Sequence, residues 1–262
     1  MDYQFNIQGI KKLIEDSKKE IADLGEIINP ILESYELEEK EFLEVCQVGK
    51  FVHKIDTEIR ITDKPKPPSP DFIISYKDKH IGLEHTRILA EDASRYLRIK
   101  TLLNFAEKIF ESKYPNINVH ATISILNDQL DYKPNEKAKL AEKIADFVQW
   151  TRLKKEFELP DFLTSIRTTK HSQVSFSYKE KKWQSELLTR DRLKKGILKK
   201  ESKIKGYKKS KFDLVEYWLI LFIGSISSVS YELNETENYE MKSKFDRVYL
   251  MADYDAKIIR IK

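Results

Sequence analysis

The chain has 262 residues, of which 40% are hydrophobic and 34% are charged, and its formal net charge is +4. This composition predicts a folded core under a heavily solvated surface, and it excludes a membrane-spanning helix because no apolar run is long enough. The single cysteine, Cys46, rules out an internal disulfide, and the first residues lack the apolar run of a signal peptide. We therefore expect a cytoplasmic protein with no membrane partner.

The first part of the chain shows helical periodicity. Apolar residues recur at helical spacing between Ile10 and Leu24, and Gly25 and Pro30 predict an interruption. Residues 1–30 are therefore expected to form a helical N-terminal extension. A second helix is predicted over 31–48 and a strand over 51–61. Residues 63–70 hold four of the eight prolines, which predicts an extended connection.

An apolar hairpin that carries two carboxylates follows this connection. Residues 72–74 and 80–83 read as short strands, and Lys77 and Asp78 mark the turn between them. This register places Asp71 directly opposite Glu84 on one face, with Cβ atoms ~5 Å apart. Two buried like charges need a proton or a cation between them, and oxygen ligands suit a hard ion such as Mg²⁺. The pair therefore predicts a metal-dependent hydrolase, although a solvated Asp–Glu pair is the plain alternative.

The remaining elements alternate between helix and strand. The patterns predict helices over 91–113, 137–153 and 184–207, strands over 118–126, 162–168, 173–178 and 217–223, and a closing hairpin over 247–251 and 257–261. This order favours an α/β fold with a central mixed sheet flanked by helices. We expect residues 31–262 to form one domain.

The most basic region runs from Arg192 to Lys211, with ten lysines or arginines against one acid, Glu201. Such a block can neutralise phosphates, and it can equally be a solvated helix face. The candidate contacts to nucleic acid are the lysines of this predicted helix, Lys194, Lys195, Lys199 and Lys205.

Several short motifs resemble the PD-(D/E)xK nuclease superfamily, which has a restriction-endonuclease-like fold. The hairpin contributes Pro70-Asp71 and Glu84-His85-Thr86, and the order of helix, strand, acidic hairpin, helix and strand is similar. The chain more particularly resembles a bacterial nuclease-like group. The further motifs are a helix with Ile197, Lys200, Lys203 and Tyr207, then the strand residues 218–221, then Phe-Asp-Arg-Val-Tyr at 245–249.

The resemblance implies roles for individual residues. Asp71, Glu84 and the backbone carbonyl of His85 would hold Mg²⁺ or Mn²⁺, and Glu41 in the preceding helix would add a further ligand. Thr86 stands where the superfamily has its lysine, and a hydroxyl carries no positive charge. Lys200 or Lys203 would then replace that lysine from the basic helix. The side chain of His85 is expected on the opposite face from Glu84 and Thr86.

Three functions follow as hypotheses. The first is a Mg²⁺-dependent nuclease, with DNA favoured over RNA as substrate and a homodimer as a possible assembly. The second is a nucleic-acid-binding module that has lost catalysis together with the motif lysine. The third is a protein-interaction component of a bacterial defence or mobile-element system. The position of the lysine amines relative to Asp71 and Glu84 distinguishes the first hypothesis from the second.

Overall fold

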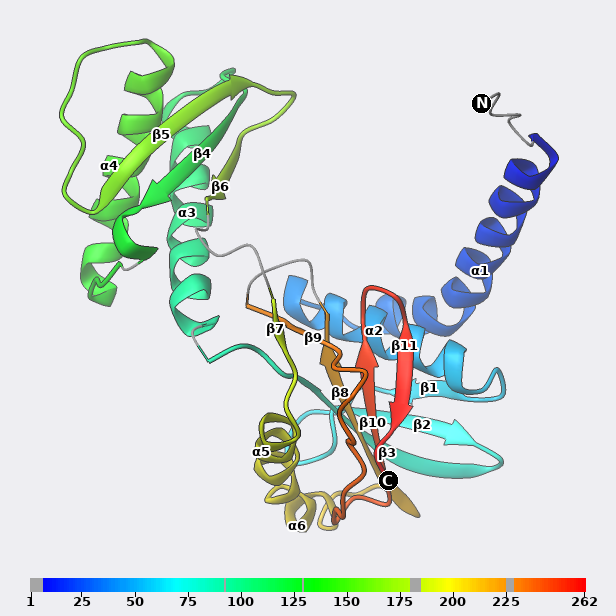
Figure 1. The fold of residues 1–262 in the computed structure, drawn as a ribbon. Coiled ribbons are helices and arrows are strands. Elements are labelled where there is room, and N and C mark those ends of the chain that lie inside the picture. The colour runs from blue at the N-terminus through cyan, green and yellow to red at the C-terminus, as the bar shows by residue number, and fades with distance from the viewer. Residues whose placement is uncertain (1–6, 92, 129, 180–184, 225–228) are drawn as a thin grey trace. The chain divides into compact units, whose positions relative to one another are not determined.

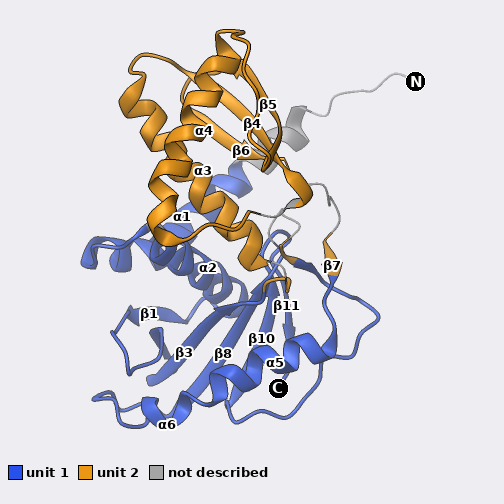
Figure 2. Cartoon of the chain, turned by 90° about the vertical axis from the view of Figure 1, so that its left-hand side faces the viewer, with its two compact units in different colours: residues 1–88, 187–226, 231–262 blue, residues 89–186, 227–230 orange. Residues whose placement is uncertain are grey.

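The computed structural model describes residues 7–91, 93–128, 130–179, 185–224 and 229–262 (Figure 1). The chain folds into two compact units (Figure 2). Unit 1 comprises residues 1–88, 187–226 and 231–262, and unit 2 comprises residues 89–186 and 227–230. The sequence predicted one domain over 31–262 instead. The difference arises because the inserted segment closes a hydrophobic core of its own.

Unit 1 is built on a six-stranded sheet with the order β1-β2-β3-β8-β10-β11. Its strands are β1 (Arg60–Asp63), β2 (Phe72–Tyr76), β3 (Lys79–Arg87), β8 (Glu216–Ile223), β10 (Arg247–Ala252) and β11 (Lys257–Arg260). The three strands β1, β2 and β3 pair antiparallel, β8 lies parallel to both β3 and β10, and β11 returns antiparallel. The expected α/β fold with a mixed central sheet is confirmed at this level.

Helices cover both faces of this sheet (Figure 1). The helices of unit 1 are α1 (Ile7–Ser34), α2 (Glu39–Ile55), α5 (Arg190–Glu201) and α6 (Ile204–Tyr207). A separate two-stranded sheet pairs β7 (Glu186–Leu187) with β9 (Tyr231–Glu232). The first two helices share a core with Leu83 and Trp218. On the other face, α5 approaches closely at Gly196, where an added Cβ would lie 3.3 Å from Leu221 Cδ2. The sheet is therefore buried on both sides, as its apolar strand β8 requires.

Two predicted boundaries near the N-terminus were wrong. Helix α1 continues through Gly25 and Pro30 to Ser34, because Ile27, Ile28 and Ile31 are buried and this packing offsets the hydrogen bond that proline cannot make. The predicted strand over 51–61 is helical as far as Ile55. Buried residues follow the helical spacing of α2 and include Val45, Val48, Phe51 and Val52.

Unit 2 packs helices against a three-stranded sheet with the order β5-β4-β6. Its elements are α3 (Ala93–Lys113), β4 (Val119–Ile125), short 3-10 helices at Leu126–Asp128 and Pro134–Glu136, α4 (Lys137–Arg152), β5 (Leu163–Lys170) and β6 (Ser175–Tyr178). All five longer elements match predicted ones. Strand β4 alternates between buried and half-buried positions, so its buried face completes the core with α3 and α4.

No helix in the described part of the chain combines the length and the apolar character that crossing a membrane would require.

Candidate active site

The hairpin of β2 and β3 has the predicted register. Tyr76 pairs with Lys79 and Phe72 with Leu83, and Lys77 and Asp78 have positive φ angles of 49° and 59°, as a tight two-residue turn needs. Asp71 immediately precedes β2 and continues this register to Glu84. Its Oδ2 accepts a hydrogen bond of 3.0 Å from the backbone N–H of the next residue, His85. The two carboxylate residues therefore lie opposite each other at the end of the β2–β3 pairing.

Glu84 is the most buried acid of the site, with a relative exposure of 1%. The ammonium groups of Lys200 and Lys203 donate to its Oε1 at 2.6 and 3.0 Å, and the Tyr207 hydroxyl donates to its Oε2 at 2.5 Å. A carboxylate removed from water needs this full set of partners, since an unpaired buried charge is costly. Tyr207 was part of a sequence motif, but the sequence did not predict its contact with Glu84.

The Lys200 ammonium lies among three oxygen atoms. In addition to Glu84, it donates to the backbone carbonyl of His85 at 3.0 Å and lies 3.9 Å from Asp71 Oδ2. These oxygens belong to three of the four residues that the sequence proposed as metal ligands, the fourth being Glu41. A monovalent cation of the chain itself therefore stands among the oxygens that a divalent ion would use.

A break in the basic segment brings its polar groups together. The sequence predicted one helix over 184–207, of which residue 184 lies outside the described part. The structure has α5 up to Glu201 and then the short helix α6, with Lys203 as its N-cap residue. The break lets Lys203 and Tyr207 contact Glu84 together with Lys200, which is still carried by α5.

The pKa values of the two carboxylates are shifted in opposite directions. Burial and the charge of Glu84 raise the pKa of Asp71 to about 6. Burial alone would also raise the pKa of Glu84, but Lys200, Tyr207 and Lys203 outweigh it and hold that pKa below its usual value. Glu84 is thus ionised at neutral pH, and on acidification the pair takes up its first proton at Asp71.

His85 directs its side chain to the opposite face of the sheet, as strand alternation predicted. It is 5% exposed, and its Nε2 lies 2.9 Å from Gln47 Oε1 on α2. Gln47 Nε2 donates to Asp253 Oδ2 at 2.7 Å, so its oxygen is left to accept and the imidazole donates from Nε2. Burial and the nearby charge of Lys200 lower the pKa of His85 to about 3, and the ring is neutral at pH 7.

Lys50 completes this network on the far side of the sheet. Its ammonium donates to Asp253 Oδ1 and to the Asp253 carbonyl, both at 2.8 Å. Sequence reasoning missed Gln47, Lys50 and Asp253. A glutamine within the apolar stripe of α2 was the available signal, because buried amides have hydrogen-bond partners.

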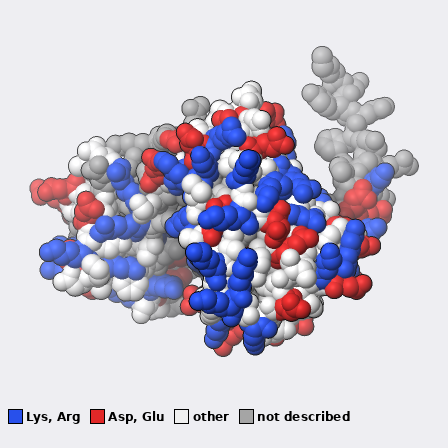
Figure 3. Space-filling view, turned by 90° about the horizontal axis from the view of Figure 1, so that it is seen from below, with Lys and Arg blue, Asp and Glu red and all other residues white. Residues whose placement is uncertain are grey.

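The other predicted site residues lie elsewhere. Glu41 is 42% exposed in the first turn of α2, where it caps the helix and faces Lys64 at 3.6 Å. Thr86 is half-buried and shares the face of Glu84 by alternation. The proposed nucleic-acid contacts all lie exposed along α5 and α6, at Lys194, Lys195, Lys199 and Lys205. Figure 3 shows lysine and arginine side chains gathered on the face seen from below, with acidic side chains among them.

The donors fit a magnesium ion better than a transition metal. Within the described residues, no three His, Cys, Asp or Glu side chains are grouped to hold one ion, so Glu41 does not join Asp71 and Glu84. Magnesium usually keeps several waters and binds through one or two carboxylates, so two carboxylates and one carbonyl are sufficient. The cluster of these oxygens around an ammonium shows that the position suits a cation.

Comparisons of the chain with protein-family models, curated proteins and solved structures found no match.

Proposed function

We propose that this protein is a metal-dependent nuclease of the PD-(D/E)xK type, which hydrolyses phosphodiester bonds in nucleic acid with Mg²⁺ or Mn²⁺. The observation that carries the proposal is the position of the Lys200 ammonium, within hydrogen-bonding distance of Glu84 and of the His85 carbonyl. A lysine amine beside the carboxylate pair is the element that Thr86 could not supply. The order of elements along unit 1, from α2 through β1, β2 and β3 to α5 and β8, supports the restriction-endonuclease-like fold.

Asp71, Glu84 and the His85 carbonyl would hold the metal ion. When bound, the ion would lower the pKa of a coordinated water and stabilise negative charge on the scissile phosphate. The chain itself fixes the ligand geometry, because the His85 N–H holds Asp71 and the Tyr207 hydroxyl holds Glu84. These contacts orient the oxygens before any ligand arrives.

Lys200 and Lys203 supply the positive charge of the site. Both amines reach Glu84 Oε1, and Lys203 is half exposed while Lys200 is only 14% exposed. A partly exposed lysine can turn from the carboxylate to a phosphate oxygen of a bound strand, whereas the buried one stays next to the ligand oxygens. We therefore assign phosphate contact to Lys203 and orientation of the attacking water to Lys200.

The exposed lysines of α5 and α6 support nucleic acid as the substrate class. They project from the two helices that carry the site lysines, so a strand bound to them passes beside Asp71 and Glu84. Such contacts act on the phosphate backbone and give salt-sensitive binding. DNA is the favoured substrate, and a homodimer remains part of the proposal.

The test is cleavage of labelled single- and double-stranded DNA and RNA with Mg²⁺, Mn²⁺ or EDTA. Glu84→Gln and Lys200→Met should each lower the rate by at least about 10²-fold, because each removes a group at the reacting centre. Lys139→Ala, on the exposed surface of α4, is the control for loss of one lysine and should cleave like the unmodified chain.

The alternatives give different results in the same assay. Salt-sensitive binding without cleavage under any metal would support the binding module that has lost catalysis. Cleavage by Glu84→Gln at the unmodified rate would refute the assignment of the site. Circular dichroism of each variant tests whether the fold is retained.

A further inference from the structure

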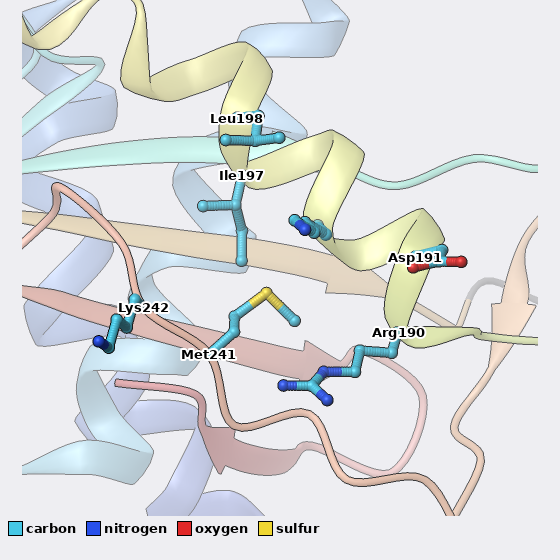
Figure 4. A pocket seen from close by; sticks show the side chains of 7 residues that line it. Arg190, Asp191, Ile197, Leu198, Met241 and Lys242 are labelled. Atoms are coloured by element: carbon cyan, nitrogen blue, oxygen red, sulfur yellow. The ribbon is translucent and has the colours of Figure 1, made fainter.

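A cavity lies on α5, away from the carboxylate pair. It measures about 410 Å³ and is formed between the helix and residues 241–242 (Figure 4). Its lining residues are Arg190, Asp191, Lys194, Ile197, Leu198, Met241 and Lys242. The volume lies within the range of small-molecule sites. The cavity shares no lining residue with the carboxylate site.

The cavity and the carboxylate site occupy opposite flanks of one helix. Leu198 lies two residues before Lys200, which is about 200° around an α-helix. The exposed lysines Lys195 and Lys199 project from the ridge between the two flanks. The two sites are therefore separated by the width of a helix, about 10 Å, along a surface whose exposed side chains are basic.

The lining combines an apolar floor with a cationic rim. Ile197 and Met241 turn toward one another in Figure 4, and Leu198 is 54% exposed. The ammonium groups of Lys194 and Lys242 form no ion pair with any described residue. Two unpaired cations above an apolar surface match a ligand with an anionic group and a flat apolar part.

Arg190 and Asp191 add fixed polar groups to this rim. Arg190 Nη2 donates to the backbone carbonyl of Glu240 at 2.7 Å, which ties the 240–242 segment to α5. The cavity wall is thus held together by a hydrogen bond as well as by packing. Asp191 is the one carboxylate of the lining, and it can accept hydrogen bonds from a sugar hydroxyl or from a base amine.

We propose that this cavity binds a nucleoside phosphate, with the phosphate between Lys194 and Lys242 and the base on Leu198 and Met241. The inference rests on the proposed function in one respect, which is that the nucleotide belongs to the strand that crosses α5 to the carboxylate pair. The cavity would then hold a nucleotide that flanks the scissile bond and would fix the position of the strand.

The experiment measures binding rather than cleavage, so it does not depend on turnover. Fluorescence anisotropy with a labelled oligonucleotide in EDTA gives the dissociation constant over a series of salt concentrations. The double variant Lys194→Ala/Lys242→Ala should flatten the dependence of log K on log salt by about 0.8, because the two lysines that neutralise one phosphate are lost. The matched control, Lys139→Ala/Lys143→Ala on α4, removes the same charge and should leave the slope unchanged.

The apolar floor is tested separately with abasic oligonucleotides. Removal of the bases should weaken binding to the unmodified chain by about five-fold, which corresponds to roughly 40 Å² of apolar surface. In Leu198→Ala/Met241→Ala this difference should disappear. Both side chains are partly exposed, so the truncations leave the core of unit 1 intact.

Two results would overturn the inference. One is a salt slope for Lys194→Ala/Lys242→Ala equal to that of the control, and the other is an undiminished base effect in Leu198→Ala/Met241→Ala. A nucleoside monophosphate should compete with the oligonucleotide on the unmodified chain and lose this effect when Lys194 and Lys242 are replaced. Undiminished cleavage by Glu84→Gln bears on the proposed function alone, so the two failures remain distinguishable.

Discussion

At the scale of single residues, Asp71 and Glu84 respond differently to the same burial. Glu84 has three donors and remains ionised, whereas Asp71 accepts a backbone N–H and has only a distant amine at 3.9 Å. The raised pKa of Asp71 therefore reports an incompletely compensated charge. Such a charge is a common mark of a binding site, because the missing partner is what the site takes up.

Asp71→Asn should stabilise the metal-free protein at neutral pH. The folded pKa of Asp71 is about 6 against an ordinary value of 3.8, so its charge opposes folding above pH 6. The gain should be about 1–2 kcal/mol at pH 8, after allowance for the partial exposure of the side chain, and should vanish below about pH 4. Urea denaturation in EDTA at several pH values measures it. A gain that grows toward low pH would contradict the assignment.

Gln47→Leu should destabilise unit 1 by about 1–3 kcal/mol, because His85 and Asp253 each lose a buried partner. The imidazole, which is neutral at pH 7, is left without an acceptor for its Nε2–H. Gln149→Leu in unit 2 is the matched control, since Gln149 accepts a bond from the exposed Arg152. Its cost should be smaller. Equal costs in chemical denaturation would show that the His85 network contributes little.

At the scale of secondary-structure elements, the hairpin is positioned by a close approach at Gly82. A Cβ at this position would lie 2.7 Å from Pro70 Cγ and 3.1 Å from Leu214 Cδ1. Pro70 immediately precedes Asp71, so the space left by one glycine determines where that carboxylate lies. The pairing of β2 with β3 is thus supported by packing from the segment before β2.

Gly82→Ala should cost about 1–3 kcal/mol and should also abolish any thermal stabilisation by Mg²⁺, because Pro70 must move and Asp71 moves with it. Gly49→Ala provides a control of the same kind. Its Cβ would lie 2.4 Å from Ile28 Cγ1 where α1 packs on α2, away from the carboxylates. It should destabilise the protein and keep the response to Mg²⁺. Thermal melting with and without Mg²⁺ distinguishes the two effects.

Local patterns were sufficient to predict the hairpin and most elements. The register follows from the turn at Lys77 and Asp78, and the buried strand β8 follows from its apolar run, so both depend on neighbouring residues. The contact of Lys200 with Glu84 spans 116 residues, and the resemblance to a nuclease family was needed to suggest it. The bond between Gln47 and Asp253 spans 206 residues, and no local pattern indicates it.

At the scale of the whole molecule, unit 2 consists mainly of an insertion between β3 and α5. The sequence shows no glycine- or proline-rich linker at either junction, and the backbone is hydrogen-bonded at the first, with the Ala90 N–H donating to the Val229 carbonyl at 2.8 Å. The division therefore could not be predicted from composition. It follows from the separate core that α3, α4 and the second sheet enclose.

Residues 89–186 expressed alone should fold, because this segment supplies all the residues of that core. The largest buried side chains within it are Phe110 and Phe176, whose ring centroids lie 5.5 Å apart. A cooperative urea transition followed by circular dichroism would support independent folding. Phe110→Ala should lower the stability of the fragment by about 3–5 kcal/mol. A fragment with no cooperative transition would show that unit 2 depends on unit 1.

The ammonium of Lys200 has a further consequence, since it acts as a counter-ion that the chain carries with it. Lys200 and Lys203 offset most of the charge of the two acids during folding without any ion from solution. Chelators should therefore leave the fold intact, unlike those metalloproteins that unfold when their ion is removed. Uptake of a divalent ion would then be an exchange, in which the ion takes the position among the oxygens and the Lys200 amine moves to its edge but stays beside it. The concentration of free magnesium, and not the assembly of the site, would set the fraction of molecules ready to act.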